Sequence, residues 1–246
     1  VIKKSMTSWF ISDLHLAPEE TRITAGFLEF LQKPQAKHQL YILGDFFNYW
    51  VGDDIVDPYV EEIKQALRET AKRGVQLFFM HGNRDFLVGQ QFCDDINCTL
   101  LPDPSLVTLN GESVLLMHGD SLCTKDTEYM NFRAMVRGND WQQKFLSQSV
   151  ADRQAFAQKA REESQKGNAM KDMDILDVTS SEVNRLMTEH KVSRMIHGHT
   201  HRPNTHEFQH DHSPMQRIVL GDWYTQGWYL KVDKQGYHLV EFDLPA

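Results

Sequence analysis

Residues 9–15 read WFISDLH, an apolar run of strand length that ends in an aspartate and a histidine. The same pattern, an apolar run closed by polar residues around a glycine, returns four times. The four stretches are LYILGD at 40–45, LFFMHGNRD at 77–85, SVLLMHGD at 113–120 and RMIHGHTH at 194–201. Short apolar runs bounded by turn residues are typical of buried strands.

Helix-like stretches separate the first three runs. Thr24–Leu31 and Tyr59–Ala71 both carry apolar residues at helical spacing, and Gly74 is a suitable stop for the second. Strands that alternate with helices predict an α/β sheet. Near the end of the chain, Trp228–Val232 and Tyr237–Phe242 flank a turn and predict closing antiparallel strands.

The polar residues that end the five runs are of the kinds that bind divalent metal ions. Because the carboxyl ends of neighbouring strands meet at one edge of a sheet, these residues are expected to converge. Two cations need about this many ligands if one carboxylate bridges them, and Asp45 is the expected bridge. The candidate ligands are Asp13, His15, Asp45, Asn83, His118, His199 and His201.

The expected assignment divides these ligands between two ions. One ion takes Asp13, His15, Asp45 and His201, and the other takes Asp45, Asn83, His118 and His199. Nitrogen and oxygen ligands without thiolate suit Mn²⁺, Fe²⁺ or Zn²⁺. Paired cations clamp the attacking and leaving oxygens of a phosphoryl displacement, so a phosphoester or pyrophosphate hydrolase is predicted.

Other acids and histidines near the motifs compete with this assignment. Asp53 and Asp54 are expected in a solvated loop, and His197 is expected to pack on its strand away from the ions. A further histidine cluster is expected in an exposed loop without a metal role. It consists of His206, His210 and His212.

Arg84 follows Asn83 directly and is always charged. Its planar fork suits a phosphate group, and we expect it to stabilise the transition state. A surface salt bridge with Asp85 is the alternative.

Composition limits the class of protein. The 246 residues are 41% hydrophobic, enough for one large core with an insertion. A formal net charge of −8 argues against a nucleic-acid binder. Three cysteines cannot form a complete disulfide set, which favours the reducing cytosol. Because no apolar run approaches the roughly 20 residues of a membrane span, we expect a protein that is soluble or bound at a membrane surface.

The stretch from about 122 to 190 differs from the rest. It has few strand signals, and the part from Arg133 to Lys171 has eight Lys or Arg against four Asp or Glu. We predict a helical cap at 122–190, inserted into a core made of 1–121 and 191–246. An ordinary crossover between two strands is the alternative.

The five motifs, in this order, resemble the calcineurin-like metallophosphoesterases. That resemblance implies a β-sandwich core flanked by helices. Within this superfamily the chain is similar, nearly end to end, to the UDP-2,3-diacylglucosamine hydrolases of lipid A biosynthesis. The stretches that carry the similarity include FISDLHL at 10–16, YILGD at 41–45, WVGDD at 50–54, HGNRDFL at 81–87, MHGD at 117–120, IHGHTHRP at 196–203 and VLGDW at 219–223.

The resemblance implies a reaction and its groups. Water attacks the α-phosphorus of UDP-2,3-diacylglucosamine, giving UMP and 2,3-diacylglucosamine 1-phosphate with two Mn²⁺ as cofactors. Catalysis is expected from Asn83, Arg84 and His199, which also hold substrate. Further substrate contacts are expected from Asp126, Ser164, Asn168 and Lys171. A different binuclear phosphoesterase, such as a soluble nucleotide-sugar pyrophosphatase or a phosphodiesterase, is the alternative.

The two acyl chains of such a substrate need apolar walls. Candidates are Trp50, Phe86, Tyr129, Phe132, Trp141 and Phe145. The cap's positive balance favours an anionic membrane surface, so we expect peripheral association with the cytoplasmic side of the inner membrane, as a monomer. One departure is Asn48, where the family usually has an acid; a contact around the ligands should differ there.

Overall fold

A six-stranded sheet carries the first three motifs. The computed structural model describes residues 6–168, 171–172 and 174–246. In spatial order the strands are β11 (Gly236–Asp243), β10 (Gln226–Asp233), β1 (Ser8–Ile11), β2 (Gln39–Leu43), β3 (Gln76–Met80) and β4 (Cys98–Leu101). Strands β1 to β4 are parallel, whereas β10 and β11 close the sheet in antiparallel fashion, as predicted.

A second sheet of five strands carries the other two motifs. Its order is β5 (Ser105–Leu109), β6 (Glu112–Leu116), β7 (Arg194–His197), β9 (Ser213–Val219) and β8 (Asn204–His210). The two sheets pack face to face through one buried cluster, in which Phe10 and Tyr41 of the first sheet meet Leu116 and Ile196 of the second. The predicted β-sandwich core is therefore confirmed.

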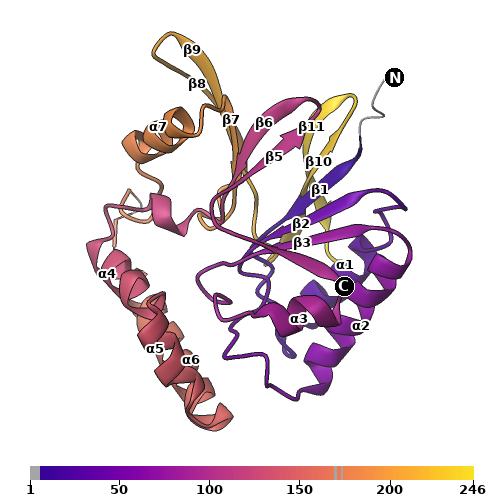
Figure 1. The fold of residues 1–246 in the computed structure, drawn as a ribbon, viewed down its shortest axis with the longest axis vertical. Helices are drawn as coiled ribbons and strands as arrows, with labels where there is room; N and C mark the ends of the chain where they lie inside the picture. The colour runs from indigo at the N-terminus through magenta and orange to yellow at the C-terminus, as the bar shows by residue number, and fades with distance from the viewer. Residues whose placement is uncertain (1–5, 169–170, 173) are drawn as a thin grey trace.

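Helices cover both outer faces of this sandwich (Figure 1). The first sheet is covered by α1 (Thr21–Phe30), α2 (Pro58–Lys72) and α3 (Gln90–Asp95). Since side chains alternate along a strand, Trp9 and Ile11 face these helices while Phe10 faces the sandwich. Helix α7 (Ser180–Glu189) packs on the second sheet, where Met187 lies against Leu115.

Three helices stand to one side of the sandwich in Figure 1. They are α4 (Thr127–Val136), α5 (Asn139–Leu146) and α6 (Val150–Asn168), joined to the fourth motif by the short 3-10 turn η1 (Asp120–Leu122). The segment 122–190 thus contains the four helices α4 to α7 among its described residues, but the last of them, α7, packs on the core. The division into core and cap stays a prediction.

A buried arginine ties α6 to the core. Arg153 is 1% exposed and donates to the Val51 carbonyl at 2.5 Å and to Asp54 Oδ1 at 2.8 Å. This ion pair fixes the start of α6 beside the loop after β2. Among the helices that the structure describes, none combines the length and apolar character needed to cross a bilayer.

Candidate metal centre and substrate site

All seven candidate ligands lie just beyond a strand end. Asp13 and His15 follow β1, Asp45 follows β2 and Asn83 follows β3. The second sheet contributes His118 after β6, and His199 and His201 after β7. The ligands therefore come from both layers of the sandwich and meet at one edge.

The first group of ligands surrounds Asp13. Ligand atoms of Asp13, His15 and His201 all lie within 4.8 Å of one another. His201 Nε2 is 3.3 Å from Asp13 Oδ1, and His15 Nε2 is 3.3 Å from Asp45 Oδ2. These contacts join the residues that were predicted to share one ion.

The second group lies on the other side of Asp45. Asp45 Oδ1 is 3.6 Å from His118 Nε2, which lies 2.9 Å from Asn83 Oδ1. The ring centroids of His199 and His118 lie 5.2 Å apart. Asp45 thus turns one oxygen toward each group, the arrangement that a bridging carboxylate requires.

The donor set fits a cation better than it fits a metal-free core. Asp13 is fully buried, and its Oδ1 has no hydrogen-bond partner among the described residues. Burial of a carboxylate oxygen without a hydrogen-bond donor destabilises the fold unless a cation compensates its charge. Five of the seven ligands also have positive φ, a conformation rare outside glycine and typical of functional sites. They are Asp13, His15, Asp45, His199 and His201.

Neighbouring groups orient the imidazoles. His118 Nδ1 lies 2.9 Å from the Leu43 carbonyl and donates to it, which leaves Nε2 as the ring atom that could ligate an ion. His15 Nδ1 contacts the Tyr224 hydroxyl at 3.0 Å, and His201 Nδ1 lies 3.4 Å from Asp222. In each case Nε2 faces the acids. Sequence reasoning missed the roles of Tyr224 and Asp222, although VLGDW at 219–223 hinted at the second.

Electrostatics show that this edge attracts positive charge. Burial alone would lower the pKa of His118, but Asp45, Asp13 and Asp120 outweigh burial and raise it to about 9. Burial would raise the pKa of Asp13, but the close contact with the His201 imidazole, together with the charge of His118, lowers it well below its usual range. Without metal, protons on imidazoles thus supply the charge that cations would bring.

Close backbone approach explains the glycines of two motifs. A Cβ at Gly82 would collide with Asp45, and one at Gly198 would collide with Ser12 and Asp13. Both glycines let their loops lie directly against a ligand of another strand.

Arg84 lies over the same edge. Its Nε is 3.5 Å from Asp45 Oδ2, its Nη1 donates to Asn48 Oδ1 at 3.1 Å, and its side chain is 23% exposed. Asn48, the departure noted above, is therefore a neutral partner of this guanidinium. Asp85 does not serve as that partner. It is buried and accepts from the Gly82 and Phe46 amides at 2.7 Å each, so the proposed Arg84–Asp85 surface salt bridge is wrong.

A buried carboxylate that sequence reasoning missed anchors α4 above the centre. Asp120 is 0% exposed and accepts from Tyr129 Oη at 2.6 Å and from Arg133 Nε at 2.7 Å. The Tyr129 ring in turn stacks near His199, with centroids 6.1 Å apart. Arg137 reaches the Gly82 carbonyl at 2.9 Å. One helix thereby contacts three of the five motifs.

The expected substrate residues are only partly brought together. Asp126 caps α4, and Lys171 Nζ lies 2.8 Å from both of its carboxylate oxygens. Ser164 is exposed on α6. Asn168 ends that helix, but its side chain lies outside the described residues.

The apolar candidates fall into two sets. The ring centroid of Trp141 is 4.7 Å from that of Phe145, on which it stacks, and 6.3 Å from that of Phe86. These three rings form an aromatic wall between α5 and the loop after β3. Trp50 is 3% exposed and packs into the main core, whereas Phe132 is 37% exposed on α4. Tyr129 stands nearest the ligands.

The competing acids and histidines lie outside the ligand groups. Asp53 and Asp54 lie in a turn, as expected, and Asp54 is exposed. Asp53 is half-buried and accepts from Trp50 Nε1, Gly89 N and Phe92 N, each at 2.9 Å. His197 is fully buried on β7. The expected exposed histidine loop is wrong, because His206 and His210 lie on β8 and only His212 lies in the turn that follows.

Comparisons with known proteins agree with this geometry. Residues 6–203 match the calcineurin-like phosphoesterase family, so the chain is a metallophosphoesterase of that class. The similarity extends to named relatives. A UDP-2,3-diacylglucosamine hydrolase of Azotobacter vinelandii is 51% identical over 97% of this chain and 100% of its own length. A UDP-2,3-diacylglucosamine hydrolase of Stutzerimonas stutzeri is 50% identical over 95% of this chain and 98% of its own length. The chain belongs to this family of hydrolases.

Proposed function

We propose that the protein hydrolyses the pyrophosphate bond of UDP-2,3-diacylglucosamine to UMP and 2,3-diacylglucosamine 1-phosphate, a step of lipid A biosynthesis. The observation that carries the proposal is the meeting of seven ligand residues beneath an aromatic helical segment. The full-length similarity to hydrolases of that name supports the choice of substrate.

We propose that the ligands divide between two ions as the sequence predicts. Asp13, His15, Asp45 and His201 would hold one Mn²⁺, and Asn83, His118 and His199 would hold a second together with Asp45. Bound there, the ions would polarise the phosphoryl group and lower the pKa of water.

Arg84 supplies a fixed positive charge beside the proposed ions. Its neutral partner Asn48 leaves the guanidinium charge available, so it can donate to phosphoryl oxygens as negative charge develops. Its contact with Asp45 holds it beside the ions.

The helical segment holds the remainder of the substrate. Lys171, with Asp126 as its resident partner, offers ammonium donors to a phosphate, and Ser164 and Asn168 offer bonds to sugar or amide groups. The aromatic wall of Phe86, Trp141 and Phe145 would line the path of the acyl chains, with Tyr129 and Phe132 of α4 as further contacts. Trp50, which packs into the core, would support this wall only indirectly.

Exposed apolar side chains on the same helices favour a peripheral position at the cytoplasmic face of the inner membrane. Phe132, Met135, Leu146 and Phe156 are 37–51% exposed on α4, α5 and α6. With nearby cations they would bind an anionic bilayer surface. We propose that the protein works there as a monomer and does not bind nucleic acid.

Substrate competition tests the assignment. The protein should hydrolyse UDP-2,3-diacylglucosamine much faster than UDP-N-acetylglucosamine, because only the former has two acyl chains that can pack against the aromatic wall. Release of UMP from both substrates under the same conditions is the measurement. Equal rates would point instead to a soluble nucleotide-sugar pyrophosphatase.

Chelation is expected to abolish activity. EDTA treatment followed by dialysis should remove turnover, and Mn²⁺ should restore it, since mixed nitrogen and oxygen ligands suit that ion. Add-back of Mg²⁺, Mn²⁺ and Zn²⁺ in separate arms identifies the preferred ion. Turnover that survives exhaustive chelation would contradict the proposed centre.

Lys171→Ala is expected to weaken substrate binding more than the chemical step. A hydrogen bond to a charged group contributes about 1.5–3 kcal/mol, so KM should rise roughly ten- to hundredfold. Steady-state kinetics separate KM from kcat. Lys159→Ala, an exposed lysine on α6, is the matched control and should change neither. An unchanged KM in the Lys171 variant would remove it from the substrate site.

A further inference from the structure

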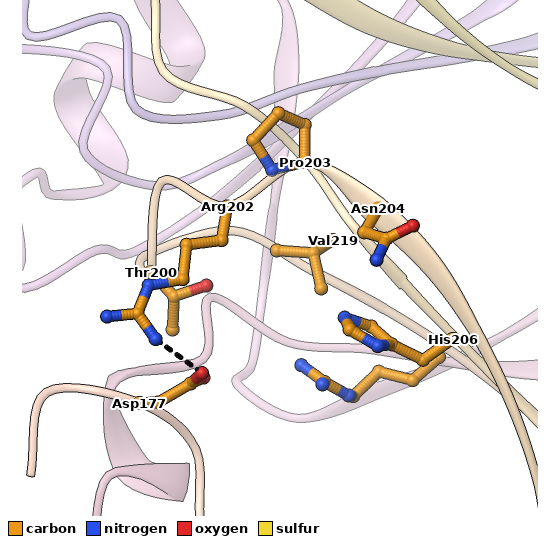
Figure 2. Close-up of a pocket in the computed structure, with 8 residues that line it drawn as sticks. Asp177, Thr200, Arg202, Pro203, Asn204, His206 and Val219 are labelled. Carbon is orange, nitrogen blue, oxygen red and sulfur yellow. Dashed lines mark hydrogen bonds and ion pairs between the residues drawn. The ribbon is translucent and has the colours of Figure 1, made fainter. Parts of the chain in front are cut away.

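A cavity lies directly behind the loop that carries the last two ligands. Its volume is about 280 Å³, and its walls include Thr200, Arg202, His206, Arg217 and Asp177 (Figure 2). Thr200 stands between His199 and His201 in the sequence, yet its side chain lines this cavity. None of the seven candidate ligands lines it. The cavity is thus a neighbour of the metal centre and not a part of it.

The cavity contains two guanidinium groups and one carboxylate. Arg202 Nη1 pairs with Asp177 Oδ2 at 2.6 Å, the bond drawn in Figure 2. Arg217 has no such partner: within the described part of the chain, no carboxylate oxygen lies within 4.0 Å of its nitrogens. Its Nη1 instead contacts His197 Nε2 at 3.1 Å.

His197 cannot neutralise Arg217. The His197 ring is fully buried, and its Nδ1 lies 2.8 Å from the Gly198 carbonyl, to which it donates. The Nε2 atom is then the acceptor for Arg217, and the ring is uncharged. The cavity therefore has an excess of positive charge at neutral pH.

Two further features point to an anionic ligand. Thr200 Oγ1 is buried and has no hydrogen-bond partner among the described residues, so a hydroxyl donor is available at the wall. Burial lowers the pKa of Arg217, because its charge is partly removed from water and the nearby charge of Asp177 offsets this only in part. A bound anion would accept a hydrogen bond from the Thr200 hydroxyl and would compensate the buried charge of Arg217.

We propose that this cavity binds a phosphate dianion, either free or as the phosphate of a nucleoside monophosphate. The planar forks of Arg202 and Arg217 suit the oxygens of such a group, and Thr200 can donate a further bond. The volume exceeds the need of a bare phosphate, and Pro203 and Val219 provide apolar walls for a sugar or base. The inference does not depend on which diphosphate the metal centre cleaves.

Tungstate, a phosphate mimic with strong anomalous scattering, locates the anion directly. Crystals of the Mn²⁺-loaded protein soaked in tungstate should show an anomalous peak between Arg202 and Arg217, separate from any peak at the metal centre. Arg217→Gln should lose the cavity peak. Arg194→Gln, which changes an arginine of the neighbouring strand β7 that pairs with Glu112, should keep it. A cavity without a peak in the wild-type crystals would overturn the proposal.

Equilibrium dialysis with labelled phosphate tests the same site in solution. The Arg217→Gln protein should bind one equivalent fewer than wild type at saturation, and equal stoichiometry would contradict the proposal. Competing UMP then separates the two sources. Displacement of the cavity anion by UMP at lower concentration than by inorganic phosphate assigns a nucleotide site, and the reverse order assigns a site for free phosphate.

Discussion

Asp45→Ala is expected to release both metal ions and to reduce turnover by on the order of 10³-fold or more. Removal of a single electrostatic donor from an active site already costs about 10²–10³ in kcat, and this substitution removes the carboxylate that faces both ligand groups. It also leaves the cationic Arg84 without its acidic neighbour. Metal content by elemental analysis and UMP release are the two measurements.

The control for this variant is an aspartate outside the site. Asp243→Ala changes an exposed residue at the end of β11 and should keep full metal content and turnover. Retention of two ions per chain in the Asp45 variant would exclude Asp45 as the bridge. Asp13 would then be the better choice, because its carboxylate has atoms within 4.8 Å of ligand atoms of His15 and His201 and also of His118.

Arg84→Ala is expected to keep both ions but to lower kcat by roughly 10²–10³, the usual effect of losing one transition-state donor. The distinction follows from chemistry, because a guanidinium does not ligate a cation but can bind the phosphoryl oxygens. Metal analysis and single-turnover kinetics with the acylated substrate check both halves of the expectation.

Two companion variants sharpen this test. Arg68→Ala removes an exposed arginine of α2 and should leave kcat unchanged. Arg84→Lys keeps the charge but loses the fork, so a partial recovery would show how much of the effect is geometric. Normal turnover in Arg84→Ala would remove this residue from the catalytic group.

Much of the core could be predicted because its strands are short apolar runs between turn residues. The apolar runs that form β1, β2, β3, β6 and β7 could be recognised as strands for that reason. Strand β8 was not, since NTHEFQH lies at a sheet edge and has little apolar character. Antiparallel pairing with the neighbouring strand β9, which a single sequence does not display, decides its conformation.

The ligand residues could be predicted for a different reason. Each one stands at a strand end, so local sequence determines both its chemistry and its place. The contacts around them depend on tertiary packing. Asp85 looked like a salt-bridge partner but binds backbone amides across two loops, and the Asp120–Tyr129 bond depends on how α4 lies over the core. No spacing rule contains that information.

The order of strands in the first sheet has a consequence for biosynthesis. Strand β1 lies between β2 and β10, so β1 must wait for the much later synthesis of β10 before its second edge is covered. The coordinating groups span positions 13 to 201 and belong to both sheets. The full set of candidate ligands therefore exists only once the chain has been synthesised past His201, and a shorter nascent chain carries acids and imidazoles that cannot yet share a cation.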